Sequence, residues 1–583
     1  MPDIRNLYNL WFGGNVCYRF LREIEMRAVS IKIHNFRSFA DAEIALTPYS
    51  LLVGVNNSGK SNLIDAIRVF YEKDIKYEES RDFPKFATSD REVWIEIEFQ
   101  PSSQEFALLK SEYQLPSGTF KVRKYLQSAE NDDEGKPKNG IYAYVGGQLS
   151  NSRFYGAKNV QQGKFGEVIY IPAVSKLDEH TKLTGPSALR DLISTVLKKI
   201  MDTSPSYIEL CAAFEKFGGQ IKSEATSEGY SLSKIEEEIT QEISDWGTSF
   251  ELLVNSITTD EIVKSLIGHR LQDRVLGQPL DPKCYGQGFQ RHLIYTLIKL
   301  SALYSSSTTR TSSRKDFSPQ LTWVLFEEPE AFLHPSQIDA LDVNLRSISS
   351  TDGMQVLIST HNPEFVSLNI EDLPSLVRIC RNNAISLTSQ VTTSSLQSLL
   401  ADNQRDFAQW QEANIPIHPD DLQVDMESIK YALWLDPRRS SAFFASKVLL
   451  VEGPTEIALL RYLLGINQLP RPAGGIFILD TIGKFNIHRF MNLLGELKIP
   501  HAVLYDYDNG KYAAVDATIQ ASQNAFTIGI DTFPENLETF LGIKSAGSSH
   551  RKPQHVMWQL SKGGIKQANI DALIAKVSTL LRI

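Results

Sequence analysis

The segment Leu51–Ser61 reads LLVGVNNSGKS and decides how the first part of the chain folds. Its three leading apolar residues predict a short buried strand, and the residues from Ser61 onward have the spacing of a helix. The strand and the helix are joined by a match to the pattern G-x-x-x-x-G-K-[ST]. In this context the pattern forms a loop that cradles phosphate groups. The segment therefore predicts a P-loop nucleotide site.

Each residue type in this loop has a physical role. Glycines let backbone N–H groups close around phosphate oxygens, and the helix N-terminus adds positive potential. Lys60 is expected to neutralise the terminal phosphates, and Ser61 to bind Mg²⁺. The residues expected to bind the nucleotide are Gly54, Asn56, Asn57, Gly59, Lys60 and Ser61.

Three later segments supply the remaining parts of a nucleoside triphosphatase. Residues 323–328 (WVLFEE) predict a strand that ends in Glu327, which can hold Mg²⁺, and Glu328, which can polarise the attacking water. Residues 357–362 (LISTHN) predict a strand that delivers His361 to the γ-phosphate. Each segment alone has a simpler explanation, because paired acids cap helices and a single histidine usually packs. Their order along the chain favours the functional one.

The third segment, residues 285–291 (YGQGFQR), lies between the P-loop and these strands. It places Gly286 and Gly288 at the start of a long apolar helix. A Gly-x-Gly sequence is usually only a turn, and it gains meaning here from the motifs on either side.

A second set of motifs lies in the last quarter of the chain. Residues 447–456 (KVLLVEGPTE) predict a strand, then Glu452, then a helix. Residues 501–509 (HAVLYDYDN) predict a strand that ends in Asp506 and Asp508. Further strands are expected at 476–479 and 525–530. Because the carboxyl ends of parallel strands meet at one edge of a sheet, these acids should converge there.

Three carboxylates at one sheet edge indicate a site for divalent cations. They would repel one another without a cation, and their oxygens suit Mg²⁺ or Mn²⁺. Such a site cleaves phosphodiesters when the metal generates hydroxide and stabilises the leaving oxygen. Glu456, one helical turn after Glu452, either shares a metal or is a solvated N-terminal acid. Glu538 offers a further carboxylate.

Bulk composition limits the possible classes of protein. With 583 residues the chain is too long for one ordinary core, and its 42% hydrophobic and 22% charged residues are typical of a globular protein. No apolar run is long enough to span a bilayer. The four cysteines form no C-x-x-C pair, which suits a reducing cytosol, so we expect a cytoplasmic protein. A net charge of −9 neither indicates nor excludes binding to nucleic acid.

The first set of motifs resembles the ABC-type ATPases of the SMC and RecF kind. The segments that carry the resemblance are Gly54–Ser61 as Walker A, Tyr285–Gln290 as the signature loop, Leu325–Glu328 as Walker B and His361 as the switch histidine. Glu327 stands where such ATPases usually carry aspartate. In these ATPases the signature loop acts on the nucleotide of a partner protomer, so the resemblance implies ATP as the ligand and a dimer.

From Met26 onward the chain resembles the OLD (overcoming lysogenisation defect) nucleases, a family that includes the Gabija defence nuclease. The stretches that carry this resemblance are SSAFFASKVLLVEGPTE at 440–456 and LYDYDN at 504–509. The resemblance implies a TOPRIM domain whose metal ligands are Glu452, Glu456, Asp506, Asp508 and Glu538. It also implies a lysine that steadies the transition state. Lys562, in the segment WQLSKG, is the first choice by its spacing from Pro553, and Lys552 is the second.

The expected fold class is α/β, with two domains. An ABC-type P-loop ATPase domain is expected at 26–400, with an inserted helical dimerisation arm at about 187–275. A polar connector at 401–440 should precede a TOPRIM α/β domain at 441–583. Residues 1–25 are expected to be a peripheral extension or a mis-annotated start.

The expected function is that of an ATP-regulated, divalent-metal-dependent DNA endonuclease or nickase. The family resemblance implies a role in defence against phage, as a homodimer or higher homo-oligomer. A defence partner, such as a helicase or a reverse transcriptase with its RNA–DNA product, would lie outside this chain. Two other functions remain open: a RecF- or SMC-like DNA-binding ATPase with an inert TOPRIM fold, and a TOPRIM topoisomerase or primase. The intact set of acids argues against the former, and the lack of an evident tyrosine-nucleophile domain or primase zinc motif argues against the latter.

Overall fold

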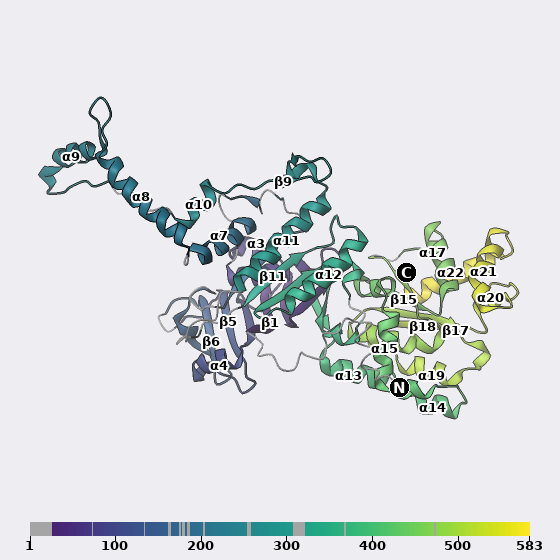
Figure 1. Cartoon of the computed structure of the whole chain (residues 1–583). Coiled ribbons are helices and arrows are strands. Elements are labelled where there is room, and N and C mark those ends of the chain that lie inside the picture. Colours follow the sequence, from purple (N-terminus) through teal and green to yellow (C-terminus); the bar gives the residue numbers. More distant parts are fainter. Residues whose placement is uncertain are drawn as a thin grey trace. The chain divides into compact units, whose positions relative to one another are not determined.

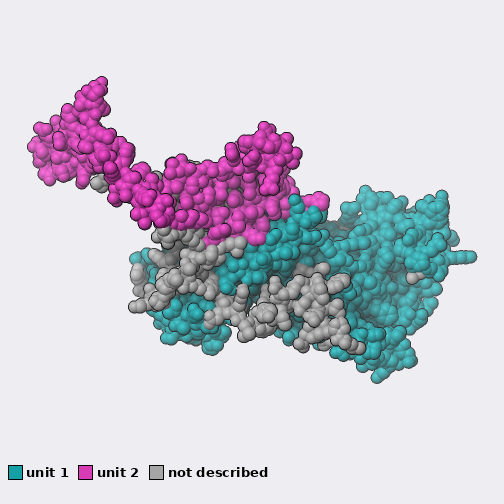
Figure 2. Space-filling view, in the orientation of Figure 1, with its two compact units in different colours: residues 1–173, 314–331, 335–583 teal, residues 174–313, 332–334 magenta. Residues whose placement is uncertain are grey.

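The computed structural model describes residues 26–582, except for short internal segments at 73, 133–134, 161–164, 174–176, 178–180, 184–186, 202–203, 253–257, 307–316, 318–320, 367–368 and 472–473. The expected extension at 1–25 lies outside the described residues. The chain divides into two compact units (Figure 2). The first comprises Met1–Ala173, Arg314–Ala331 and Pro335–Ile583, and the second comprises Val174–Ser313 and Phe332–His334.

The first sheet of unit 1 is antiparallel and six-stranded (Figure 1). Apolar and polar residues alternate along these strands, as in the buried Ile31 and Ile33 beside the more exposed Lys32, so one face enters the core. The strand order is β2 (Phe39–Ala45), β1 (Arg27–Phe36), β4 (Val93–Gln100), β5 (Phe120–Gln127), β6 (Gly140–Val145) and β7 (Gln148–Arg153).

The second sheet carries the P-loop. Its inner strands are near-continuous apolar runs, as expected for parallel strands covered on both faces. The helix after β3, α2 (Lys60–Tyr71), buries Leu63, Ile67 and Phe70 in a core shared with the first sheet. The strand order is β14 (Ile385–Gln390), β13 (Leu376–Asn382), β3 (Tyr49–Val53), β12 (Met354–Ser359), β11 (Thr322–Glu327) and β8 (Glu167–Ile171), parallel except for the β13–β14 hairpin.

The third sheet is four-stranded and entirely parallel, and it forms the C-terminal α/β domain. Its strands fall where the sequence pattern predicts them. A core of leucine, isoleucine and valine side chains joins the sheet to helices α17 (Pro454–Gly465) and α22 (Gln567–Leu581). The strand order is β16 (Phe477–Asp480), β15 (Val448–Val451), β17 (His501–Asp506) and β18 (Thr527–Phe533).

The segment expected to be a connector is largely helical and packs on this third sheet's helices. It contains α14 (Phe407–Glu412) and α15 (Val424–Trp434). Glu427 on α15 accepts two hydrogen bonds, of 2.7 and 2.8 Å, from Arg489 on α18 (Ile487–Glu496), and both side chains are buried. The Trp410 indole donates to the Thr518 hydroxyl at 2.9 Å. The segment is therefore part of the C-terminal domain's packing.

A small set of hydrogen bonds joins the ATPase sheet to the C-terminal domain within unit 1. Arg378 on β13 is buried and donates to the carbonyl oxygens of Leu497, Lys498 and Ala445, at 3.5, 3.2 and 3.2 Å. The Ser389 hydroxyl donates to the Leu497 carbonyl oxygen at 2.8 Å. The Leu497 and Lys498 carbonyls follow the C-terminal end of α18, where a helix carries partial negative charge, so a guanidinium is well placed there.

Unit 2 is mostly helical, and the expected insertion at 187–275 falls inside it. Its helices are α7 (Ala188–Met201), α8 (Pro205–Ser223), α9 (Leu232–Glu242), α10 (Thr259–Ser265) and α11 (Gln287–Ser306). Helix α7 packs against α11, and α8 extends away from α7 to carry α9 at its far end (Figure 1). Among the described helices of the whole chain, none combines the length and the apolar composition needed to cross a membrane.

Candidate functional site

The P-loop is shaped by two glycines with positive φ. Gly54 has φ +144°, and a Cβ there would lie 2.0 Å from the Ile379 carbonyl oxygen. Gly59 has φ +112°, and its Cβ would lie 2.4 Å from the Ser386 hydroxyl. A side chain at Gly54 would therefore collide with the backbone of β13, and one at Gly59 would collide with the side chains of Ser386 and Ser38. L-residues also rarely adopt such φ values. The sequence requires glycine here for steric reasons as well as for phosphate binding.

Lys60 lies buried at the start of α2, and its ammonium donates to the carbonyl oxygens of Gly54 and Val55 at 2.9 and 3.1 Å. Burial lowers the pKa of Lys60 to about 8, while the charges of Glu328, Glu330 and Glu327 oppose this shift. The structure therefore brings this lysine and the acids after β11 together, because β3, β12 and β11 are adjacent parallel strands.

The two predicted catalytic groups of this site approach each other. His361 Nε2 lies 3.6 Å from Glu328 Oε1. Burial, and then the charge of Lys60, lowers the pKa of His361, which favours the neutral form of its imidazole. Glu328 has φ +44° and donates its backbone N–H to the Ser359 carbonyl oxygen at 2.7 Å. Glu327 accepts a hydrogen bond of 3.1 Å from the Tyr170 hydroxyl.

Glu330 is a functional candidate that sequence reasoning did not assign. Its Oε1 accepts hydrogen bonds from the Thr360 hydroxyl at 2.7 Å and from the His361 backbone N–H at 2.8 Å. Burial raises the pKa of this carboxyl group. Glu330 thus fixes the backbone that presents His361. Its position two residues after Glu328, in the run EEPE, was the available signal.

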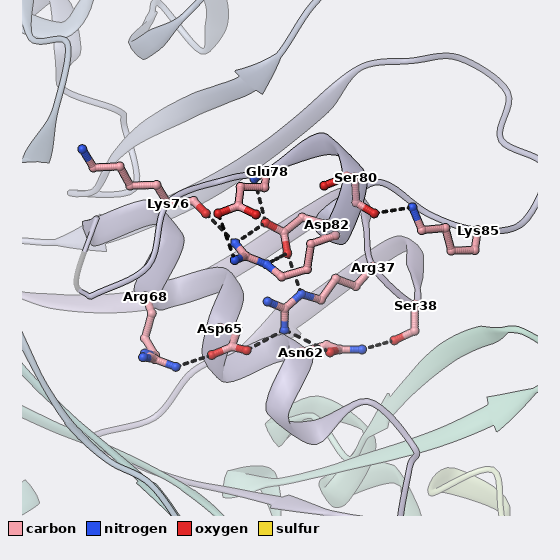
Figure 3. A network of polar contacts seen from close by, with 11 residues as sticks. Arg37, Ser38, Asn62, Asp65, Arg68, Lys76, Glu78, Ser80, Asp82 and Lys85 are labelled. Atoms are coloured by element: carbon pink, nitrogen blue, oxygen red, sulfur yellow. Dashed lines mark hydrogen bonds and ion pairs between the residues drawn. The ribbon is translucent and has the colours of Figure 1, made fainter.

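An arginine-centred network, also not predicted, holds the P-loop helix (Figure 3). Arg37, in the turn after β1, contacts Asp65 and Asn62 on α2 at 2.5 and 3.4 Å. Its Nε donates to the fully buried Asp82 at 2.8 Å. The Asn62 amide donates to the Ser38 hydroxyl at 2.7 Å. Residues from three parts of the chain therefore fix the first turns of α2.

The predicted signature loop lies at the start of α11 in unit 2. The rings of Tyr285 and Phe289 stack with centroids 4.5 Å apart, and the Gln290 amide donates to the Tyr285 carbonyl oxygen at 2.8 Å. Gly286 immediately precedes the helix and Gly288 lies in its first turn, between these contacts. The loop is thus ordered by its own side chains.

Four of the predicted metal acids gather at the carboxyl edge of the third sheet. Glu452 follows β15, Asp506 ends β17, Glu456 lies in the first turn of α17, and Glu538 lies in α20 (Leu537–Phe540). Glu452 Oε1 accepts from the Asp506 backbone N–H at 2.7 Å. Asp506 Oδ1 accepts from the Leu537 backbone N–H at 3.0 Å. These bonds tie the ends of two strands and of α20 together.

Glu456, Asp506 and Glu538 are buried and Glu452 is half-buried, and this perturbs the ionisation of the cluster. Burial raises the pKa of Glu452 and of Glu456 to about 7. The charges of Glu456 and Asp508 also raise the pKa of Glu452, and the charge of Glu538 also raises that of Glu456. Burial and the charges of Glu452 and Glu456 raise the pKa of Asp506 to about 8. Around neutral pH these groups compete for protons, which is the condition that a divalent cation relieves. An oxygen-only donor set of this kind fits Mg²⁺ or Mn²⁺.

Within the described part of the chain, no three His, Cys, Asp or Glu side chains stand close enough together to hold a metal ion as they are. The carboxylates are engaged by other groups instead. Glu456 Oε2 accepts from the Gly453 backbone N–H at 3.2 Å, and Asp508 Oδ2 lies 3.4 Å from the ammonium of Lys484. Asp508 is therefore held beside the other four acids by a lysine.

The two candidate lysines lie at opposite ends of α21 (Lys552–Ser561). Lys552 Nζ lies 3.5 Å from Glu538 Oε1. Burial lowers the pKa of Lys552, but the charges of Glu538, Asp506 and Glu456 outweigh this and raise it overall. Lys562 follows the helix about 15 Å further along its axis, is exposed, and lies 4.8 Å from the Trp558 ring. The structure therefore brings Lys552 to the acids and leaves Lys562 away from them, because a spacing rule does not fix which end of a helix faces a site.

Family comparisons agree with this division into two sites. The family model for the AAA ATPase domain matches residues 26–161 and 138–366. The model for the overcoming lysogenization defect protein-like TOPRIM domain matches residues 443–508. The P-loop site and the carboxylate cluster thus define a nuclease that carries an ATPase domain.

Curated relatives narrow this class to one family. The chain is similar to the Old nuclease of Escherichia phage P2, at 24% identity over 83% of this chain and 77% of that protein. It is also similar to endonuclease GajA of Bacillus cereus (strain VD045), at 24% identity over 83% and 75%, and to the OLD nuclease of Thermus scotoductus, at 21% over 82% and 81%. The chain belongs to the OLD family of nucleases.

Proposed function

We propose that this protein is a divalent-metal-dependent DNA endonuclease or nickase whose activity is controlled by ATP. The observation that carries the proposal is the cluster of buried carboxylates at the carboxyl edge of the third sheet, with pKa values of about 7 to 8 for Glu452, Glu456 and Asp506. The name of the similar endonuclease GajA supports this reaction type.

The residues proposed to hold Mg²⁺ or Mn²⁺ are Glu452, Glu456, Asp506, Asp508 and Glu538. A divalent ion held by these oxygens would favour ionisation of a water molecule at neutral pH and would stabilise the leaving oxygen of a phosphodiester. The protein's own part is to orient these oxygens. The hydrogen bonds from Asp506 to Glu452 and from Leu537 to Asp506 do this before any ligand arrives.

Lys552 is the residue that we propose to act on the phosphodiester. Its ammonium is charged and lies at the edge of the acid cluster, where it can donate to a phosphate oxygen. Lys562, which the sequence spacing favoured, is exposed at the far end of α21. We therefore assign the role to Lys552.

ATP is proposed to bind at the P-loop, with Lys60 on its terminal phosphates and Ser61 and Glu327 on its Mg²⁺. Glu328 polarises the attacking water, and His361 senses the γ-phosphate. The contact between His361 and Glu328, at 3.6 Å, supports their joint role. The signature glycines, Gly286 and Gly288, would meet the nucleotide of a second copy, so the active species is proposed to be a homodimer or a higher homo-oligomer.

We further propose a role as an anti-phage effector, supported by the resemblance to the OLD family. A defence partner, either a helicase or a reverse transcriptase with its RNA–DNA product, would be encoded separately. The genes beside the one that encodes this chain would distinguish between these two partners and an enzyme that acts alone.

The decisive experiment measures nicking of supercoiled plasmid by the full chain with Mg²⁺ or Mn²⁺. We expect cleavage in either metal, none in EDTA, and none with Glu452→Ala in either metal. ATP should change the rate of the parent but not that of Lys60→Ala. Metal-independent cleavage, or cleavage by Glu452→Ala at the parental rate, would place the activity elsewhere.

A further inference from the structure

Lys484 occupies an unusual position in the C-terminal domain. It follows Gly483 in the turn after β16 and opens the short helix η10 (Lys484–Asn486) that leads into α18. Its side chain is only 3% exposed. Lysine is almost never buried to this degree without partners, so each of its contacts deserves a physical reason.

The ammonium of Lys484 contacts both Asp506 and Asp508, at the two ends of the turn that follows β17. Its Nζ donates to the backbone carbonyl oxygen of Asp506 at 2.8 Å and lies 3.4 Å from Asp508 Oδ2. The turn between them is conformationally demanding, since Asp508 has φ +55° and Asn509 has φ +54°. A cation that binds the carbonyl before Tyr507 and the carboxylate after it holds this turn in one geometry.

A second set of groups holds the lysine itself. Asp516 on α19 (Ala513–Ala521) is buried, and its Oδ1 lies 2.7 Å from Lys484 Nζ. The rings of Tyr505, Tyr507 and Tyr512 lie 5.2, 6.0 and 5.8 Å from the same nitrogen. A negative carboxylate and three aromatic faces restrict the ammonium to a small volume. Asp516 thus aims Lys484 at the turn.

We propose that Lys484, aimed by Asp516, is a positioning residue of the nuclease site that fixes Asp508 for binding a divalent cation. The inference rests on the proposed metal-dependent nuclease function and adds a requirement to it. The side chain does not need to touch DNA or the metal. It acts by holding the carbonyl of Asp506 and the carboxylate of Asp508 in register.

Charge and position predict effects of opposite sign, which makes the proposal testable. If Lys484 acted only as a nearby positive charge, its removal would strengthen cation binding, because like charges repel. If it positions Asp508, its removal should weaken cation binding, because the turn loses its anchor. Supporting groups around metal ligands typically contribute about 10- to 100-fold in affinity or activity.

The test compares the full-length parent with Lys484→Met, Lys484→Arg and Asp516→Asn. Mn²⁺ binding is titrated directly by calorimetry, and plasmid nicking is measured against Mg²⁺ concentration. Lys484→Met should need about tenfold more of either metal, Lys484→Arg should recover part of the loss, and Asp516→Asn should shift in the same direction by less. ATP binding at the P-loop reports whether each variant is folded. Lys566→Met removes an exposed lysine of the same domain and should match the parent.

Unchanged or tighter Mn²⁺ binding by a folded Lys484→Met would overturn the proposal. If that variant fails to fold, Asp516→Asn decides: weaker Mn²⁺ binding supports the positioning role, and parental binding contradicts it. If the parent itself binds Mn²⁺ but does not nick DNA, the nuclease proposal fails while the titrations still decide the role of Lys484.

Discussion

The nucleotide site buries a lysine and the nuclease site buries an aspartate, and the pKa shift of each residue indicates the charge of the ligand that would complete its site. In the nucleotide site, burial lowers the pKa of Lys60 to about 8 even though three glutamates oppose the shift. In the nuclease site, burial raises the pKa of Asp506 to about 8 although Lys552 opposes it. Desolvation disfavours the charged form of either group. The first site would be completed by an anion and the second by a cation, in agreement with the phosphate and Mg²⁺ that we propose as their ligands.

The sharpest test of this contrast is to disable one site and measure both. Asp506→Ala should lower the rate of nicking by about a thousandfold or more, because losing a metal ligand removes several kcal/mol of transition-state stabilisation. Its affinity for ATP should equal that of the parent. Nicking of supercoiled plasmid and equilibrium binding of a fluorescent ATP analogue are measured on one preparation. A loss of both activities would show that the two sites are not separable in this way.

The second prediction asks which lysine completes the nuclease site. Lys552→Met should slow nicking by roughly a hundredfold, since one preorganised donor to a developing charge contributes about this much. Lys562→Met should change the rate of nicking by no more than about twofold, because an exposed side chain away from the acids contributes little to stabilising the transition state. Single-turnover nicking rates at saturating Mg²⁺ decide the matter. The reverse ranking would restore the assignment based on spacing.

The third prediction concerns the acids of the nucleotide site. Glu328→Gln should retain ATP but slow hydrolysis by about a hundredfold, because the amide cannot polarise water as the carboxylate does. Phosphate release and ATP binding are measured separately, with Glu371→Gln, an exposed acid of the same domain, as the control. Equal hydrolysis by Glu328→Gln and the parent would assign the role to another group.

The smallest expected effect is a pH dependence at Lys60. Its pKa in the folded chain, about 8, is below its ordinary value of 10.5, so between these values the folded chain carries fewer protons than the unfolded one. Lys60 therefore makes the ligand-free protein relatively more stable as pH rises through this window. Phosphate should restore the proton, so ATP affinity should fall by up to about tenfold between pH 8 and pH 9. Calorimetry in buffers of different ionisation enthalpy would detect the proton uptake; a constant affinity with no uptake would contradict it.

The positions of both candidate sites in the fold could be predicted from the sequence because their main residues lie in contiguous strand–turn segments. Gly54–Ser61, Glu327–Glu328 and Asp506–Asp508 each follow an apolar run, and adjacent parallel strands bring such ends together whatever the rest of the chain does. Local patterns of this kind can be recognised in the amino-acid sequence alone.

The residues that the sequence did not reveal act through contacts between distant segments. Arg37 forms ion pairs with Asp65 and Asp82, and Lys484 forms one with Asp516. No local sequence pattern predicts these contacts. The 401–440 segment is polar in composition, which suggested a connector. Its helices pack because a few large side chains, among them Trp410 and Tyr431, are buried.

The contact of Arg378 with the C-terminal domain has a consequence for dividing the protein. All three acceptors of this buried guanidinium are backbone carbonyls beyond residue 440. A fragment that ended at 440 would therefore lose all three of these acceptors and expose to water a side chain that is buried in the full chain. The ATPase sheet and the C-terminal sheet should accordingly melt in one calorimetric transition, and proteolysis between them should release neither as a stable folded fragment.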